Sequence, residues 1–182
     1  DGIARLLSEE LWARSDFTGA AVAAQVAKTT PEDHGLFLAS SLPVRLVDWF
    51  APSNGPRRRV AANRGASGID GTVASAAGFA EGLDAPVTLL IGDQALLHDL
   101  NSLAMLSRIR YPVTVVVLNN GGGGIFDHLP VSEHKSIFEK HFVNAHDMRF
   151  EDIARQFGLD YSGPPSIDEF MRVFRQSLER NT

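Results

Sequence analysis

Two polar residues, Asp93 and Asn120, stand just beyond apolar runs that have the composition of buried β-strands. The runs cover residues 86–91 and 113–118. In open α/β sheets ligands bind at the carboxyl ends of the strands. A strand, a crossover helix and a second parallel strand bring two such ends side by side. The pattern therefore predicts that this carboxylate and this amide share one site.

The chemistry of the pair points to a divalent cation. Mg²⁺ takes oxygen ligands, often only one or two of them carboxylates, with phosphate and water completing its shell. The four glycines after Asn120 allow the backbone to approach a phosphate and to turn a carbonyl toward a metal. We interpret the stretch as a clamp for Mg²⁺ and a diphosphate. Taken separately, Asp93 could be only a helix cap, and the glycine run only a loop.

The same stretch resembles the thiamine diphosphate signature, in which GDG precedes NN. Here Gly92-Asp93-Gln94 is followed, after 24 residues, by Asn119-Asn120. Further motifs narrow the resemblance to the MenD family, the 2-succinyl-5-enolpyruvyl-6-hydroxy-3-cyclohexene-1-carboxylate synthases. They lie at residues 40–45, 63–71, 97–101 and 123–130, and the run Asn-Arg-Gly-Ala-Ser-Gly-Ile-Asp from residue 63 is the most specific.

The resemblance implies a set of site residues. Mg²⁺ would be bound by Asp93, Asn120 and the backbone carbonyl of Gly122. Thiamine diphosphate would contact Gly65, Ser67, Ile69, Gly92, Asp93, Asn120, Gly121, Gly122 and Ile125. Ile69 would be the apolar wedge that bends the cofactor into a V shape, although from the residues alone it reads as an ordinary core isoleucine.

The resemblance also implies a substrate pocket formed by Ser41, Arg45, Arg64, Ile125 and Phe126. The two MenD substrates, 2-oxoglutarate and isochorismate, are dicarboxylates, and arginine binds carboxylates through a planar fork. Without the resemblance, Arg45 and Arg64 read as surface salt-bridge partners.

The activity that follows from the resemblance is that of a thiamine diphosphate- and Mg²⁺-dependent transferase. Such an enzyme decarboxylates 2-oxoglutarate and adds the succinyl unit to isochorismate in menaquinone or phylloquinone biosynthesis. Two alternatives stay open. One is another thiamine diphosphate enzyme, such as a 2-oxoacid decarboxylase or an acetohydroxyacid synthase-like protein. The other is a non-catalytic remnant domain, for which Ala95 and the truncated ends are the best support; Gln94 and Gly121 also depart from common family residues.

No residue matches the glutamate that activates the cofactor in this family, so no catalytic residue is assigned. The resemblance implies that this glutamate belongs to a pyrimidine-binding domain of a partner subunit, in a homodimer or a dimer of dimers. The 182-residue chain alone is therefore expected to be inactive.

Composition excludes several other classes. The chain has 182 residues and a net charge of −5, which argues against a nucleic-acid surface. It has no cysteine, so disulfides and thiolate metal sites are excluded. No apolar run approaches the length of a membrane span. We expect a cytoplasmic protein, with a plastid location also open.

The elements that must position the site alternate between strands and helices. Strands are predicted at residues 35–39, 57–62, 86–91 and 112–118, and helices at 3–13, 17–28, 43–50, 69–83, 95–109, 138–142, 150–157 and 166–178. Thr18 and Ser166 are the expected helix caps. The alternation predicts an α/β fold, a doubly wound parallel sheet with helices on both faces. We interpret residues 1–182 as one diphosphate-binding domain, the C-terminal fragment of a longer chain, with 1–33 a helical lead-in from a preceding domain.

Overall fold

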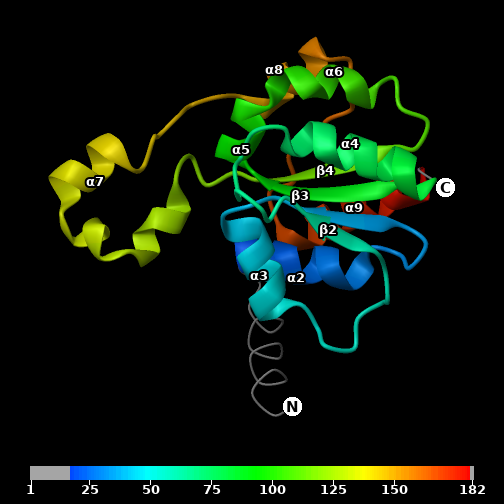
Figure 1. Cartoon of the computed structure of the whole chain (residues 1–182), viewed down its shortest axis with the longest axis horizontal. Coiled ribbons are helices and arrows are strands. Elements are labelled where there is room, and N and C mark those ends of the chain that lie inside the picture. Colours follow the sequence, from blue (N-terminus) through cyan, green and yellow to red (C-terminus); the bar gives the residue numbers. More distant parts are fainter. Residues whose placement is uncertain (1–16, 181–182) are drawn as a thin grey trace.

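A computed structural model describes residues 17–180, and its centre is a parallel sheet with helices on both faces (Figure 1). The sheet has four strands in the order β2-β1-β3-β4. Their bounds are β1 Gly35–Leu38, β2 Val60–Ala62, β3 Val87–Gly92 and β4 Val113–Leu118. The predicted doubly wound α/β fold is confirmed.

The central strands β1 and β3 carry the core. Every residue of β1 is buried, and so are the first five of the six residues of β3. Such unbroken apolar runs are typical of parallel strands that are covered on both faces. β3 and β4 pair in level register, from Val87 opposite Val113 to Gly92 opposite Leu118. The two strands therefore end side by side.

Helices form one layer on each face. The first face is covered by α4 (Thr72–Leu83), α5 (Asp93–His98), α6 (Leu103–Leu106) and α8 (Phe150–Gln156), whose buried side chains pack with those of β1 and β3. The second face is covered by α2 (Gly19–Thr29), α3 (Leu42–Phe50) and α9 (Ile167–Glu179). Figure 1 shows the two layers above and below the sheet.

Both expected helix caps are present. The Thr18 hydroxyl accepts a hydrogen bond from Ala21 N at 3.2 Å, and Ser166 accepts one from Glu169 N at 3.3 Å. The helix predicted at 3–13 lies outside the described residues. α2 packs on the sheet through buried Val22 and other side chains, while the assignment of 1–33 to a preceding domain stays a prediction.

The prediction of one continuous helix over 95–109 is wrong. The structure has α5, then the 3-10 turn η1 (Leu100–Ser102), then α6. The break comes at Asp99, whose carboxylate accepts hydrogen bonds from Val73 N and Ala74 N of α4 and from the Ser102 hydroxyl. Bonds to a distant element have overridden the local helical preference.

Several predicted boundaries also shift, and the helix predicted at 138–142 is α7 (Lys135–His141). α4 begins at Thr72 rather than at residue 69, because Gly71 adopts the left-handed region at φ +65° and cannot continue a helix backward. β2 starts at Val60 rather than at residue 57, as a short edge strand paired only with β1.

An arm leaves the body after β4. It consists of η2 (Gly124–His128), η3 (Pro130–Glu133) and α7 (Lys135–His141), and it projects away from the sheet in Figure 1. Its own aromatic contacts hold it together: the Phe142 ring lies 5.6 Å from that of Phe126 and 6.2 Å from that of Phe138. The chain then returns to the sheet edge before α8.

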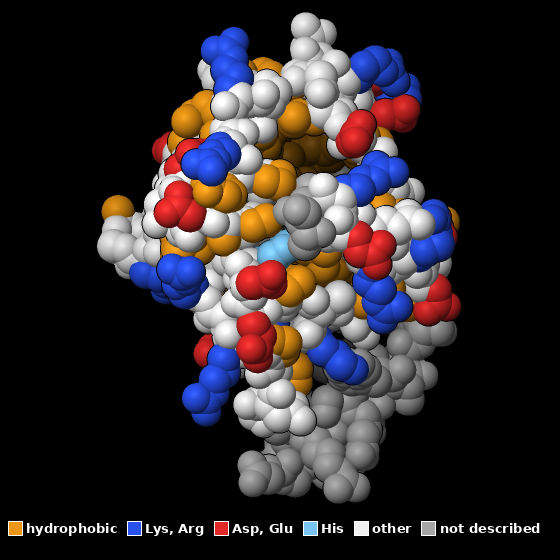
Figure 2. Space-filling view, turned by 90° about the vertical axis from the view of Figure 1, so that its right-hand side faces the viewer, with side chains coloured by type: hydrophobic (Ala, Val, Ile, Leu, Met, Phe, Trp, Pro, Cys, Tyr) orange, Lys and Arg blue, Asp and Glu red, His pale blue; other side chains and the backbone are white. Residues whose placement is uncertain are grey.

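The surface carries charge of both signs. On the face shown in Figure 2, acidic and basic side chains are interspersed around apolar ones. Within residues 17–180, no helix combines the length and the apolar character that crossing a bilayer requires.

The buried imidazole of His34 predicts a pH dependence of stability. His34 is 3% exposed, and burial lowers its pKa below the usual 6.5, against a smaller opposing effect of Asp33. Below about pH 6.5 the imidazole of the unfolded chain binds a proton that the buried imidazole does not. The free energy of unfolding therefore falls as the pH is lowered. When the pH is lowered from about 7.5 to about 5.5, the free energy of unfolding measured in urea should fall by about 1 kcal/mol less in His34→Leu than in wild type. The exposed His141→Leu serves as the control, and equal losses in all three proteins would contradict the assignment.

Candidate metal and diphosphate site

All four strands run in the same direction, so their carboxyl ends form one edge of the sheet. Each group of sequence-predicted residues follows one of these ends. Ser41 follows β1, with Arg45 on the next helix; Arg64 follows β2; Asp93 follows β3; Asn120 follows β4. The sheet therefore gathers the predicted metal and substrate residues at one edge.

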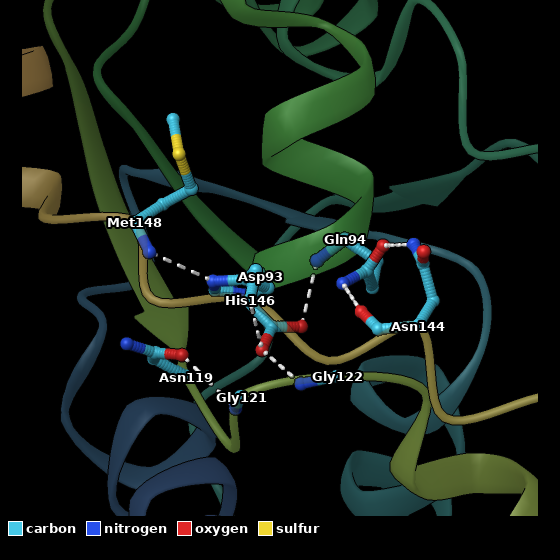
Figure 3. Close-up of polar contacts among 8 residues, drawn as sticks. All are labelled: Asp93, Gln94, Asn119, Gly121, Gly122, Asn144, His146 and Met148. Carbon is cyan, nitrogen blue, oxygen red and sulfur yellow. Dashed lines mark hydrogen bonds and ion pairs between the residues drawn. The ribbon is translucent and has the colours of Figure 1, made fainter. Parts of the chain in front are cut away.

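Asp93 is the centre of the site (Figure 3). The residue is only 2% exposed, at the first position of α5. Oδ1 accepts a hydrogen bond from Gln94 N at 2.6 Å, and Oδ2 accepts one from Gly122 N at 3.0 Å. A buried carboxylate is costly unless such donors surround it. The glycine loop is thus bonded directly to the strand end beside it.

Asn120 brings its side-chain amide to the same carboxylate. One amide atom lies 2.9 Å from the Gly122 carbonyl oxygen and 3.2 Å from Asp93 Oδ2. Because both neighbours are acceptors, nitrogen at that position donates to both of them, and turning the amide over would present its oxygen to the same place instead. Adjacent ligands of an octahedral Mg²⁺ with bonds of 2.0–2.1 Å lie about 2.9 Å apart. The donor set therefore fits a magnesium ion bound by the three residues predicted from the sequence.

Close packing fixes the shape of the glycine loop. A Cβ on Gly122, whose φ is +157°, would collide with the Val143 carbonyl oxygen. A Cβ on Gly124 would collide with the Asn120 side-chain amide. The Asn119 side chain accepts from Gly121 N at 3.1 Å and starts the turn. The first asparagine of the pair therefore shapes the loop, and the second faces Asp93.

Sequence reasoning missed a second group of residues around Asp93, for which no local pattern provides a signal. His146 Nε2 lies 3.2 Å from Asp93 Oδ2, and its Nδ1 accepts from Met148 N at 3.3 Å, which leaves the proton on Nε2 (Figure 3). Asn144 and Gln94 form a reciprocal pair: Gln94 Nε2 donates to the Asn144 carbonyl at 3.0 Å, and Asn144 Nδ2 donates to Gln94 Oε1. These bonds tie the chain returning from the arm to the site.

The predicted substrate residues lie on three elements. Arg45 Nη1 donates to the Ser41 carbonyl oxygen at 2.7 Å, so the predicted Ser41–Arg45 association exists, through the backbone rather than the hydroxyl. Ser41 itself has a φ of +73°, a strained conformation for a residue with a side chain. Arg64 is exposed at the end of β2. Ile125 and Phe126 are half-buried at the root of the arm, in η2.

The predicted wedge and its loop lie between β2 and α4. Gly65 and Ser67 are exposed, Ile69 is half-buried against the core, and the Thr72 hydroxyl donates to the Ile69 carbonyl at 3.1 Å. A hydrogen-bond chain runs from Ser40 through Asn63 and Ser75 to Gly71. This chain links the ends of β1 and β2 to the start of α4.

Among the residues that the structure describes, no cluster of three His, Asp or Glu side chains is placed to hold a metal ion. A cation at this edge would therefore depend on one carboxylate, one amide and one backbone carbonyl. That composition suits a hard cation whose remaining ligands come from phosphate and water.

Comparison with known proteins identifies the class to which this fold and site belong. The chain belongs to the thiamine pyrophosphate enzymes, as a C-terminal TPP binding domain, which its residues 46–182 match.

Among curated proteins, the chain is similar to 2-succinyl-5-enolpyruvyl-6-hydroxy-3-cyclohexene-1-carboxylate synthases. The Rubrobacter xylanophilus protein is 56% identical over 173 residues, which cover 95% of this chain and 30% of that protein. The Chlorobium phaeobacteroides protein is 51% identical over 142 residues, which cover 77% of this chain and 24% of that protein. The predicted resemblance to the MenD family is confirmed, and the chain spans less than a third of these relatives.

A solved structure shares the fold. The thiamine diphosphate-dependent 4-hydroxybenzoylformate decarboxylase of Rhodococcus jostii RHA1 superposes with a TM-score of 0.71 over 91% of this chain and 31% of that one. At 21% identity the likeness concerns the arrangement of the sheet and helices.

A first prediction for the site concerns Gly122. Gly122→Ala should lower the free energy of unfolding by about 1–3 kcal/mol, because the new Cβ collides with the Val143 carbonyl and the backbone is unfavourable for alanine. Urea denaturation measures the loss. Gly82→Ala is the matched control: it lies in α4 with open space around it, and should stabilise by about 0.5–1 kcal/mol. A Gly122→Ala protein as stable as wild type would show that the loop packs differently.

Proposed function

We propose that this chain is the diphosphate-binding domain of a thiamine diphosphate- and Mg²⁺-dependent transferase. The parent enzyme would decarboxylate 2-oxoglutarate and add the succinyl unit to isochorismate, forming 2-succinyl-5-enolpyruvyl-6-hydroxy-3-cyclohexene-1-carboxylate. This step serves menaquinone biosynthesis, or phylloquinone biosynthesis in a plastid. Three observations support the proposal: the family to which the chain belongs, its sequence identity to the synthases compared above, and the chemistry of the residues at the carboxyl edge of the sheet.

The observation that carries the metal and cofactor part is the convergence of the Asp93 carboxylate, the Asn120 side-chain amide and the Gly122 carbonyl. Their spacing is that of neighbouring ligands on one octahedral Mg²⁺. Two diphosphate oxygens and a water would complete the shell. Gly92, Gly121 and Gly65 leave the backbone open where the cofactor would lie, since no atom lies within 4 Å of a Cβ built on any of the three.

When bound, thiamine diphosphate supplies the electron sink that decarboxylation and carbon–carbon bond formation require. Ile69 would supply an apolar side chain against the cofactor, with Ser67 two residues before it in the same loop. Arg45 and Arg64 orient the substrate carboxylates, and Ser41 holds the Arg45 guanidinium through its carbonyl. Ile125 and Phe126 form an apolar wall that excludes water from the reacting end.

The activating glutamate would come from outside this chain. We propose that a pyrimidine-binding domain of a partner subunit supplies it, which makes the working unit a homodimer or a dimer of dimers. The cytoplasmic location stays a prediction, with the plastid as the alternative.

Calorimetric titration of the parent protein tests the cofactor. Thiamine diphosphate should bind with a heat that depends on Mg²⁺, and Asp93→Ala should weaken that binding by at least about a hundredfold, because the only charged ligand is lost. Asp127→Ala, which removes an exposed carboxylate from η2, should bind as wild type does. Absence of any metal-dependent heat in the wild type would favour the remnant domain instead.

Arg64→Ala tests the substrates. Loss of a charged hydrogen-bonding fork should lower kcat/KM for the dicarboxylate substrates by about tenfold to a hundredfold, with the cofactor affinity unchanged. Arg59→Ala, an exposed arginine just before the same strand, should have no such effect. An Arg64→Ala enzyme with undiminished kcat/KM for both dicarboxylates would point to a different thiamine diphosphate enzyme.

A further inference from the structure

We propose that Asp99 is a positioning residue of the cofactor site. Its carboxylate replaces the missing N-cap of α4, and it thereby fixes the loop that carries Ile69 relative to Asp93. The inference rests on the proposed function, because the spacing of Ile69 and Asp93 matters only if both contact thiamine diphosphate.

The start of α4 lacks a capping side chain of its own. Its N-cap position is Gly71, in the left-handed region, and this position makes no side-chain cap hydrogen bond. The first N–H groups of a helix need acceptors. Asp99 Oδ2 supplies one from another element: it accepts from Val73 N at 2.6 Å and from Ala74 N at 3.3 Å. Asp99 is 9% exposed, so water hardly competes for these bonds.

The other side of Asp99 is fixed to the diphosphate clamp. Asp99 is the C-cap of α5, the short helix whose first residue is Asp93. Its Oδ1 accepts from the Ser102 hydroxyl at 2.6 Å, which holds the carboxylate in place. Asp99 comes six positions after Asp93, which along a helix is a rise of about 9 Å. α5 therefore acts as a spacer of fixed length between the metal ligand and the cap of α4.

The wedge depends on the first turn of α4. The Ile69 carbonyl accepts from the Thr72 hydroxyl. Residues 64–68 just before it are exposed, and a Cβ on Gly65 or Gly68 would meet no atom within 4 Å. Ile69 packs only partly against the core and its carbonyl is held by Thr72, so fraying of the first turn would displace Ile69. The Asp99 carboxylate bonds to Val73, Ala74 and Ser102 rather than to the clamp residues, and the clamp should therefore keep its geometry when Asp99 is changed.

Two ligands separate positioning from general stability. The affinity for Mg²⁺ with inorganic diphosphate depends on the clamp alone. The affinity for Mg²⁺ with thiamine diphosphate depends on the clamp and on Ile69 together. In calorimetric titration of the parent protein, Asp99→Ala should weaken thiamine diphosphate binding by about tenfold and leave inorganic diphosphate within about twofold of wild type. Asn is as good a helix cap as Asp and keeps an acceptor oxygen at this position. Asp99→Asn should therefore bind thiamine diphosphate with an affinity within about threefold of wild type.

Further variants keep the test decisive. If Asp99→Ala does not fold, Ser102→Ala can replace it, because it removes only one hydrogen bond to the Asp99 carboxylate. It should weaken the binding of thiamine diphosphate by about threefold and leave that of inorganic diphosphate unchanged. Asp168→Ala removes an exposed carboxylate from the first turn of α9, on the opposite face, and should change neither affinity. Amide hydrogen exchange at Val73 and Ala74 should quicken in Asp99→Ala.

The outcomes are distinct. Equal weakening of both ligands, or unchanged thiamine diphosphate affinity in Asp99→Ala, overturns the positioning role. Failure of the wild-type protein to bind thiamine diphosphate with Mg²⁺ overturns the proposed function instead, and it appears in the first titration before any variant is made.

Discussion

The level ends of β3 and β4 are the constraint on which the site depends. Because Gly92 pairs opposite Leu118, the residue after β3 emerges beside the loop after β4. That residue is Asp93, whose carboxylate is buried at the sheet edge and must find donors. Gln94 N and Gly122 N provide them. The carboxylate therefore orders the glycine loop, and the loop in turn keeps the carboxylate in a single orientation.

A site built on one carboxylate has an electrostatic consequence. A divalent cation held by Asp93, an amide and a carbonyl would keep a net positive charge, whereas a cluster of three carboxylates would leave it negative. The remaining charge attracts a diphosphate into the open coordination positions. Among residues 17–180 no group of three His, Asp or Glu side chains could hold a metal ion, so a cation at this edge would have Asp93 as its one carboxylate ligand.

Sequence reasoning succeeded where the chemistry follows strand order. Apolar runs predict all the strands of the described sheet. The rule that ligands bind at strand ends then predicts that Asp93 lies beside Asn120. It failed where hydrogen bonds join distant segments. His146 lies 53 residues from Asp93, and Asp99 lies 26 residues from Val73, so no local sequence pattern predicts either contact. Asp99 in particular reads as one more residue of a helix, because its role is to cap a different one.

The structure also gives a physical reason for each residue at which the chain departs from the common family pattern. Gln94 bonds the returning chain at Asn144, whose φ of +45° favours asparagine over most residues. Gly121 has a φ of +75°, which glycine adopts without strain. Ala95 is 4% exposed and packs in the core beside the sheet. None of the three substitutions removes an oxygen atom from the set formed by Asp93, Asn120 and Gly122, so these departures are compatible with a working clamp and give no support to a domain that has lost its site.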